Sequence, residues 1–333
     1  MPLPDFLIVG APKAGTTALH VALARHPELF MSPIKEPKFF LTDEAAPIAR
    51  GGPGDARTIR EQVWRRADYE ALFDAAPPGT LKGESTTLYL HDHQAHRRIR
   101  GLIPQAKLIA VLRDPVDRAH SNWTHLRSAG LEPEADFLKA CALEDARKEK
   151  GWAPFWRYLE QGRYGEHLEH LLSVFPEDQV LVLLYRDYRD NPTKTVDTVC
   201  TFLGVSTGVV TEVPTENVTV ASSHSTVNDV LRRVIRLADE VDHHLPFGLG
   251  NVVKVPATAL LQREQRTRPA LTAQQRELLI PQVEADIRLL ESLTGRSFSH
   301  WLDPRNGVDR AALEVDGLFG TAFRSIDRPS PAE

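Results

Sequence analysis

One short loop combines two glycines, a lysine and two hydroxyl side chains in a pattern that can hold an anion. The letters GAPKAGTT occupy residues 10–17, between an apolar run and a helical pattern. A loop of this kind directs backbone N–H groups and the positive end of a helix at a bound anion. An ordinary glycine turn, in which the two threonines only cap the helix, is the alternative. The candidate phosphate-binding residues are Lys13, Ala14, Gly15, Thr16 and Thr17.

The lysine of this loop does not stand where nucleoside-triphosphate loops place theirs. Those loops follow the pattern Gly-x4-Gly-Lys-Ser/Thr, and the lysine covers the β- and γ-phosphates. Gly10 and Gly15 keep the spacing, but Thr16 occupies the lysine position and the only loop lysine is Lys13. The loop therefore suits a phosphate anion with a different leaving group, and it does not suit Mg·ATP chemistry.

A second set of anion-binding side chains follows another apolar run, at residues 108–112. Arg113 comes directly after this run, and the aspartate and proline behind it favour the start of a helix. On that helix Arg118, Ser121 and His125 share one face, because their spacing is i, i+3 and i+7. Arg113 and Ser121 together can grip a phosphate through a charged fork and a hydroxyl. A solvated helix face beside an exposed arginine is the alternative.

The elements that must position these side chains are buried strands alternating with helices. Continuously apolar runs, typical of strands buried on both faces, lie at residues 6–9, 108–112 and 180–185. Helical spacing of apolar residues recurs at residues 164–175, 191–203 and 272–294. A capping box at Thr272 and Gln275 opens the last of these helices. The alternation predicts an α/β fold with a central parallel sheet flanked by helices, and ligands bind such sheets at the carboxyl ends of the strands.

Three segments together resemble the sulfotransferases that use 3′-phosphoadenosine 5′-phosphosulfate (PAPS). They are PKAGTT at residues 12–17, KEPKFF at 35–40 and LRDPVDRAHS at 112–121. Looser likenesses lie at residues 83–90, 162–164 and 293–296. The resemblance spans about residues 5–302 and is closest to the heparan-type and bacterial carbohydrate branch. It implies a P-loop-like nucleotide-binding sulfotransferase fold.

The resemblance also implies a reaction and a role for each candidate residue. A sulfonate group would pass from PAPS to a hydroxyl, or as second choice an amine, of a small-molecule or glycan acceptor, leaving 3′-phosphoadenosine 5′-phosphate (PAP). The loop from Lys13 to Thr17 would hold the 5′-phosphosulfate, and Arg113 with Ser121 the 3′-phosphate. Glu36 would be the catalytic base, and His125 matches a histidine at the acceptor site of some relatives.

The chemistry of in-line sulfonate transfer fits these residue types. Negative charge develops on the leaving oxygen, where the Lys13 ammonium can stabilise it. A carboxylate such as Glu36 can take the proton of the attacking hydroxyl, and Lys38 can neutralise sulfonate oxygens. No metal is required, because side chains supply the cations. A surface acid in a turn is the alternative for Glu36, while Glu84 is either a second carboxylate of the site or a structural hydrogen-bond acceptor.

Two departures from the family pattern stand out, and two other functions are kept open. Asn122, followed by Trp123, stands where some relatives stack an aromatic side chain on adenine. We find no clear match for the late loop that closes over the 3′-phosphate. The alternatives are a kinase-like phosphoryl transferase, against which Thr16 argues, and a non-catalytic nucleotide-binding protein.

Composition and charge restrict the partners and the location. The chain has 333 residues, 42% of them hydrophobic and 26% charged, with a net charge of −5. The overall charge therefore does not attract nucleic acid, which is itself negative. No apolar run is long enough to span a bilayer, and the start lacks the basic segment of a signal peptide. Cys141 and Cys200 fit free thiols, so we expect a cytoplasmic protein, with its oligomeric state left open.

The sequence also predicts how the chain divides. Residues 1–303 form the expected sulfotransferase domain, within which 214–269 is a candidate lid or acceptor-binding region. Residues 304–333 are expected to form a loosely packed or disordered tail. The run HDHQAH at 91–96 matches no familiar zinc spacing, so we expect a solvated helix end there, and the same applies to His243 and His244.

Overall fold

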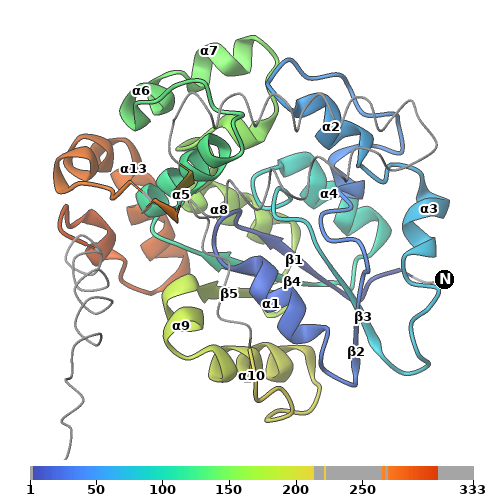
Figure 1. The fold of residues 1–333 in the computed structure, drawn as a ribbon. Coiled ribbons are helices and arrows are strands. Elements are labelled where there is room, and N and C mark those ends of the chain that lie inside the picture. Colours follow the sequence, from blue (N-terminus) through green and yellow to red (C-terminus); the bar gives the residue numbers. More distant parts are fainter. Residues whose placement is uncertain (1–2, 214–220, 223–264, 267–268, 307–333) are drawn as a thin grey trace, which may run out of the picture.

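A five-stranded parallel sheet forms the centre of the computed structural model, which describes residues 3–213, 221–222, 265–266 and 269–306 (Figure 1). Its strand order is β2-β3-β1-β4-β5, and every pairing is parallel. The strands are β1 (Phe6–Gly10), β2 (Leu29–Met31), β3 (Leu81–Ser85), β4 (Lys107–Leu112) and β5 (Val180–Leu184). The predicted α/β class with a parallel sheet flanked by helices is confirmed.

The three predicted apolar runs form β1, β4 and β5, which make up the middle and one edge of this sheet. The sequence did not predict β2 and β3. All five residues of β1 are buried, as expected for a strand covered on both faces. By contrast, β2 has three residues and β3 carries Lys82 and Glu84, so neither shows a long apolar run. Gly83 of β3 lies against Phe6, whose ring would come within 2.2 Å of an added Cβ. The close pairing of β1 and β3 therefore needs a glycine at that position.

Helices cover both faces of the sheet. On one face α1 (Thr16–Leu23) packs against α10 (Pro192–Leu203), and on the other α4 (His93–Leu102) packs against α8 (Tyr164–Val174) (Figure 1). Right-handed crossovers that run in opposite directions from the centre of a sheet place helices on opposite faces. The remaining α-helices are α2 (Asp55–Arg60), α3 (Arg66–Ala71), α5 (Pro115–Ser128), α6 (Phe137–Ala142), α7 (Glu144–Glu149), α9 (Tyr185–Asp190) and α13 (Ala273–Thr294).

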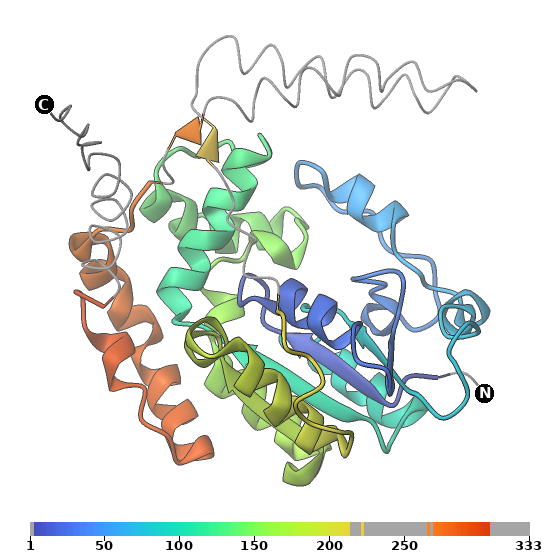
Figure 2. The same ribbon diagram turned by 60° about the horizontal axis from the view of Figure 1, so that its bottom comes forward.

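The long helix α13 is fastened to the start of α5 by a buried arginine. Figure 2 shows α13 along the side of the molecule, where it contacts α8 and α5. Arg276 is fully buried and pairs with Asp114 at 2.6 Å and with Asp117 at 2.8 Å. The predicted capping box of Thr272 and Gln275 is present at its first turn. Asp114 also caps α5, so one carboxylate connects the second anion-binding segment to α13.

Several expectations fall largely outside the described residues. Of the region 214–269, the structure describes the backbone of two short strands, β6 (Ala221–Ser222) and β7 (Gln265–Arg266), which pair antiparallel beside α5, together with residue 269. His243 and His244 lie outside the described part, as does the tail from residue 307 onward. The tail's first three residues are described, and Asn306 Nδ2 donates to Asp114 Oδ2 at 2.8 Å. The division of the chain at residue 303 stays a prediction.

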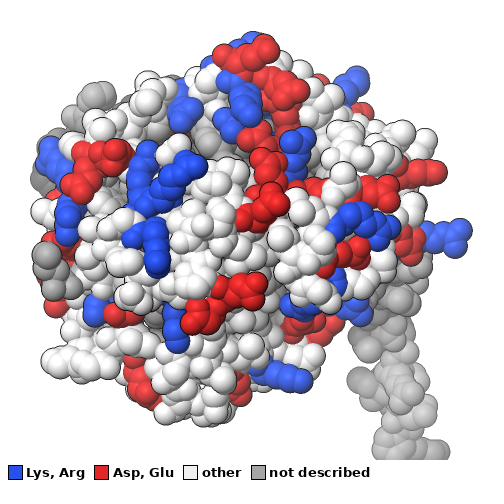
Figure 3. All heavy atoms as spheres, turned by 180° about the vertical axis from the view of Figure 1, so that it is seen from behind, with Lys and Arg blue, Asp and Glu red and all other residues white. Residues whose placement is uncertain are grey.

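The surface opposite to that in Figure 1 carries charges of both signs. Figure 3 shows lysine and arginine side chains interspersed with aspartate and glutamate on that face, with neither sign alone over a broad area. Within the described ranges, none of the helices combines the length and the apolar character needed to cross a membrane.

Candidate functional site

The two anion-binding segments lie side by side because the strands that carry them are neighbours. Ala11 N–H, at the end of β1, donates to the carbonyl of Val111 in β4 at 2.8 Å. The chain leaves β1 toward β2 on one side of the sheet and leaves β4 toward β5 on the other. Such a divergence opens a crevice at the carboxyl ends of the two strands, where open α/β sheets bind ligands.

The loop after β1 has the conformation of an anion cradle. Gly15 has φ +84° and stands at the N-cap of α1, and no described side chain caps this helix start. A Cβ at Gly15 would come within 3.0 Å of the Tyr185 ring, so both the backbone angle and the contact require glycine. Lys13 also has a positive φ of 67°, a strained backbone of the kind that clusters at functional sites. Thr16 is buried and Thr17 is exposed at the helix start.

Arg113 joins this loop to the second segment. Its Nη1 donates to the carbonyl oxygen of Lys13 at 3.1 Å. Its guanidinium also lies 4.8 Å from the centre of the Tyr185 ring, a cation–π contact. The arginine is thus held from two sides and only partly exposed. A guanidinium has five N–H donors, so others remain to receive an anion at the same place.

On the helix after Arg113, His125 lies near the loop lysine, whereas Arg118 points into the protein interior. Ser121 is buried on α5, and His125 is half-buried one turn further along. Burial and the positive charge of Lys13 lower the pKa of His125 to about 4, so its ring is neutral at pH 7 and within electrostatic reach of the loop lysine. Arg118 is fully buried and donates to the carbonyl of Tyr158. Arg118 therefore stabilises the packing around α5, and its guanidinium does not face the candidate anion site.

Glu36 lies in the segment that follows β2, beside the end of β3, and three donors hold its carboxylate. Its backbone N–H donates to the Ser85 carbonyl at 2.9 Å, which ties the turn to the strand. Thr87 donates to the carboxylate twice, from N–H to Oε2 and from Oγ1 to Oε1, both at 3.1 Å. Lys35 Nζ lies 2.8 Å from Oε1. The Glu36 side chain is 27% exposed, and its backbone has a φ of +63°. Both features distinguish it from a freely moving acid on the surface.

Two cationic or basic side chains beside Glu36 complete this part of the site. His20 Nδ1 lies 2.8 Å from Ser85 Oγ, and burial, assisted by the charge of Lys35, lowers the pKa of His20 to about 4. Burial also lowers the pKa of Lys38, while the negative charge of Glu36 opposes that shift. The sequence motifs did not single out His20. Its place one turn after Thr16 on the same helix is the signal that could have found it.

Glu84 is a structural carboxylate beneath the site. It is fully buried in β3 and accepts hydrogen bonds from Tyr69 Oη at 3.2 Å and Thr86 Oγ1 at 2.9 Å. Burial raises the pKa of Glu84 to about 7, with the nearby charge of Glu36 acting in the same direction. Of the two expectations for Glu84, this geometry favours the hydrogen-bond acceptor.

Asn122 and Trp123, the two residues after Ser121, make hydrogen bonds within the protein. Asn122 Nδ2 donates to the carbonyl of Phe155 at 2.8 Å, and Trp123 Nε1 donates to the carbonyl of Glu134 at 3.1 Å. Tyr185 is one aromatic side chain that does stand at the strand ends, between Gly15 and Arg113. It is the first residue after β5, which is the only signal that the sequence offered for it.

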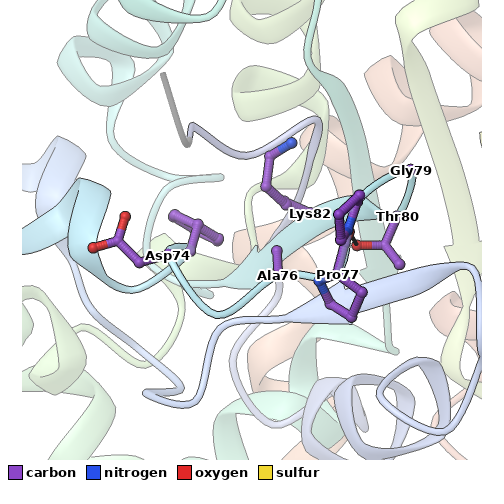
Figure 4. A pocket seen from close by; sticks show the side chains of 8 residues that line it. Asp74, Ala76, Pro77, Gly79, Thr80 and Lys82 are labelled. Atoms are coloured by element: carbon purple, nitrogen blue, oxygen red, sulfur yellow. Dashed lines mark hydrogen bonds between the residues drawn. The ribbon is translucent and has the colours of Figure 1, made fainter.

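At least two hollows open on the described surface, and one of them adjoins the site. A hollow of about 340 Å³ at the ends of β4 and β5 is lined by Arg113, Tyr185, Trp301 and other residues. The second, of about 410 Å³, is lined by Asp74, Lys82 and their neighbours (Figure 4). It lies at the amino end of β3, opposite the edge that carries Glu36 and the loop, so it plays no part in this site.

Comparison with known proteins identifies the family. The family described as "Sulfotransferase domain" matches residues 3–244. The human bifunctional heparan sulfate N-deacetylase/N-sulfotransferase 3 is 32% identical over 209 residues, and the mouse N-deacetylase/N-sulfotransferase 1 is 33% identical over 213 residues. These matches cover 61% and 62% of this chain but only 22% of each relative, so the chain spans about a fifth of their length.

A solved structure agrees with the family match over most of the chain. The crystal structure of a sulfotransferase from Alicyclobacillus acidocaldarius is 28% identical, with a TM-score of 0.68, and the match covers 90% of this chain and 99% of that one. The chain therefore belongs to the sulfotransferase domain family.

Proposed function

We propose that PAPS lies across the carboxyl ends of β1 and β4, with its two anionic ends in the two segments described above. Lys13, Ala14, Gly15, Thr16 and Thr17 hold the 5′-phosphosulfate, and Arg113 and Ser121 hold the 3′-phosphate. The observation that carries this assignment is the hydrogen bond from Arg113 to the Lys13 carbonyl at 3.1 Å. Because the two segments touch, one nucleotide is long enough to reach both.

Glu36 acts as the general base in this proposal. The oxygen of the acceptor hydroxyl attacks sulfur, an O–S bond forms, and the hydroxyl proton passes to the Glu36 carboxylate. A carboxylate offers about four lone-pair positions. Thr87 and Lys35 occupy three of them, which leaves room for the acceptor proton. The three donors also fix the carboxylate in place, as positional catalysis requires.

Lys13 stabilises the leaving group, and His125 contacts the acceptor. As the bond from sulfur to the bridging oxygen breaks, the electron pair stays on the 5′-phosphate oxygen of PAP. The Lys13 ammonium and the N–H groups at the start of α1 offset that charge. The lowered pKa of His125 supports its place near Lys13, where a neutral ring can accept or donate a hydrogen bond to the acceptor. Lys38, beside Glu36, neutralises sulfonate oxygens.

The acceptor is a carbohydrate or a small molecule that carries a hydroxyl. The similarity to heparan sulfate N-sulfotransferases favours a carbohydrate, and the N-sulfotransferase activity of those relatives makes an amine the second choice. The cytoplasm is the proposed location, supported by two buried cysteines that are both free thiols. The proposed catalytic domain is residues 1–303, supported by the packing of α13 against α8.

One experiment tests the reaction and the acceptor class together. The enzyme is mixed with labelled PAPS and a panel of hydroxylated metabolites, oligosaccharides and amino sugars, and products are read by mass spectrometry. We expect one SO₃ unit to be gained by members of one class, and Glu36→Gln to abolish that gain. Tight binding of ATP without detectable binding of PAPS or PAP would contradict the proposal and favour the phosphoryl transferase.

A further inference from the structure

Histidines from two helices gather on the sheet face that α4 and α8 cover. The rings of His93 and His170 stack with their centres 4.0 Å apart, and His96 Nδ1 lies 2.9 Å from His170 Nδ1. The ring of His167 lies 5.9 Å from that of His93. The expectation of a solvated helix end is wrong for His96, which is fully buried. The cause is the packing of α8, whose histidines lie about 75 residues away in the chain.

His167 offers a nitrogen lone pair that the described protein leaves unused. Its Nε2 lies 3.0 Å from the carbonyl oxygen of Glu160, and a carbonyl only accepts, so Nε2 carries the hydrogen. The neutral ring therefore has its lone pair on Nδ1. Nδ1 is buried without a hydrogen-bond partner among the described residues, and the whole residue is only 3% exposed.

A second histidine with an unused nitrogen and a carboxylate lie close to His167. His93 Nε2 is also buried without a partner in the described part of the chain. One ring nitrogen from each histidine and one carboxylate oxygen of Glu166 lie within 4.8 Å of one another. Buried nitrogens without a hydrogen-bond partner are rare in folded proteins and call for an explanation such as a bound ion or water.

We propose that His93, Glu166 and His167 form a binding site for one divalent transition-metal ion of the zinc type. Two imidazoles and one carboxylate are a donor set that zinc takes, with water in the remaining position, whereas magnesium and calcium prefer oxygen donors alone. Donors on a tetrahedral zinc ion lie about 3.3 Å apart. The candidate donor atoms, which lie within 4.8 Å of one another, therefore have to move closer together, and the side chain of Glu166 is exposed.

The surroundings support a metal ligand at His167 in particular. Histidines that bind metals usually donate their other N–H to a carbonyl or carboxylate, which fixes the tautomer and the ring orientation. The Glu160 carbonyl plays that part here. The backbone near Glu166 is also fixed, because Asp286 of α13 accepts from the N–H groups of Gly165 and Glu166 at 2.9 and 2.8 Å.

The ion would join α4 to α8 as a structural cross-link. His93 is the first residue of α4, while the other two ligands come from the first turn of α8. Binding to the folded state alone raises the melting temperature with the concentration of the ion. This site is separate from the proposed catalytic groups, so its existence does not depend on the proposed function.

The test is a metal titration of the whole untagged protein after treatment with a chelator. We expect one zinc ion per chain, a higher melting temperature with zinc, and a visible absorption band when cobalt replaces it. Glu166→Gln and His93→Gln should each weaken binding by about 10–100-fold. Glu169→Gln, an exposed acid on the same helix, is the matched control and should leave binding unchanged.

The outcomes separate the proposal from adventitious binding. Equal zinc affinity in the wild type, Glu166→Gln and His93→Gln would overturn it, as would the absence of any binding at micromolar zinc. Circular dichroism checks that each variant folds. If His93→Gln does not fold, Glu166→Gln decides alone, because its side chain is exposed and its substitution leaves the core intact.

Discussion

Arg113 Nη1 donates a hydrogen bond to the carbonyl oxygen of Lys13, although the two residues lie 100 positions apart in the chain. The bond joins the ends of two neighbouring parallel strands at the edge where they diverge. It also uses the carbonyl of the one lysine in the loop, so the position of that lysine depends on the arginine. A change at Arg113 should therefore affect both ends of a bound nucleotide.

Replacement of Arg113 by lysine should weaken PAP binding by at least about tenfold, since a lysine cannot reproduce the planar contacts of a guanidinium. The variant keeps the charge but loses the stacking on Tyr185 and the geometry of the bond to Lys13. Isothermal titration with PAP measures the effect. Arg97→Lys, on the exposed side of α4, serves as the control. An unchanged PAP affinity in Arg113→Lys would remove the 3′-phosphate site from Arg113.

Glu36→Gln should lower turnover by at least about 100-fold while PAP affinity stays the same. Glutamine has nearly the same shape and still accepts from Thr87, but it cannot take a proton from the acceptor. Steady-state rates and PAP titrations separate the two effects. The surface acid Glu177 gives the comparison variant, Glu177→Gln, which should retain full activity. If Glu36→Gln turns over normally, another group is the base.

Lys13→Ala should raise the pKa of His125 as well as slow the reaction by at least about 100-fold. The positive charge of Lys13 contributes to the lowered pKa of His125, so its removal moves that pKa back toward 6.5. Burial, the larger cause, remains, so the return is partial. A pH titration followed by NMR of the histidine ring measures the shift. A pKa of His125 that does not move would place Lys13 too far away for the proposed site.

The residues of the site divide into those that local patterns reveal and those that only packing reveals. The glycine loop, Arg113 and Ser121 follow directly from a strand-then-helix pattern, so sequence spacing sufficed to propose them, and their roles stay predictions. His20 and Tyr185 carry no such pattern, because each reaches the site only when its helix packs against a neighbouring strand end. Arg118 shows the converse, since helical spacing placed it beside Ser121 while tertiary packing turned it inward.

The fold shows the same division. The strands buried on both faces were predictable, because a continuous apolar run has few other uses in a soluble chain. The edge strand β2 and the polar strand β3 were not, since their residues are set by the neighbours they pair with, as Gly83 is by Phe6. The histidine cluster was misread for a related reason. Half of it lies on α8, and nothing in the run at residues 91–96 indicates that partner.

The fold should lose stability as the pH falls from about 6.5 toward 3, in part through His96 and His167. Burial lowers the pKa of each to about 3, whereas an unfolded histidine titrates near 6.5. Between these values the unfolded chain binds more protons, so acidification favours unfolding. Glu84 acts in the opposite sense, because its raised pKa of about 7 stabilises the fold at low pH. In protein kept metal-free with a chelator, His167→Gln should therefore flatten the dependence of the urea midpoint on pH relative to the wild type, and an equally steep curve would contradict this.

Gly15→Ala should reduce PAP affinity by more than the change of one methyl group suggests. The residue has φ +84°, which costs an alanine of order 1 kcal/mol, and the added Cβ would lie 3.0 Å from the Tyr185 ring. Relief of that contact moves Tyr185, whose ring contacts the Arg113 guanidinium. A substitution in the loop proposed to hold the 5′-phosphosulfate should therefore also disturb the proposed 3′-phosphate site. Gly79→Ala has nearly the same backbone angle, φ +85°, with open space around its Cβ, and so isolates the backbone strain from the contact. PAP affinity measured for both variants decides the matter. Loss in Gly15→Ala alone is the expected result, and intact affinity in Gly15→Ala would show that the tyrosine does not transmit the change.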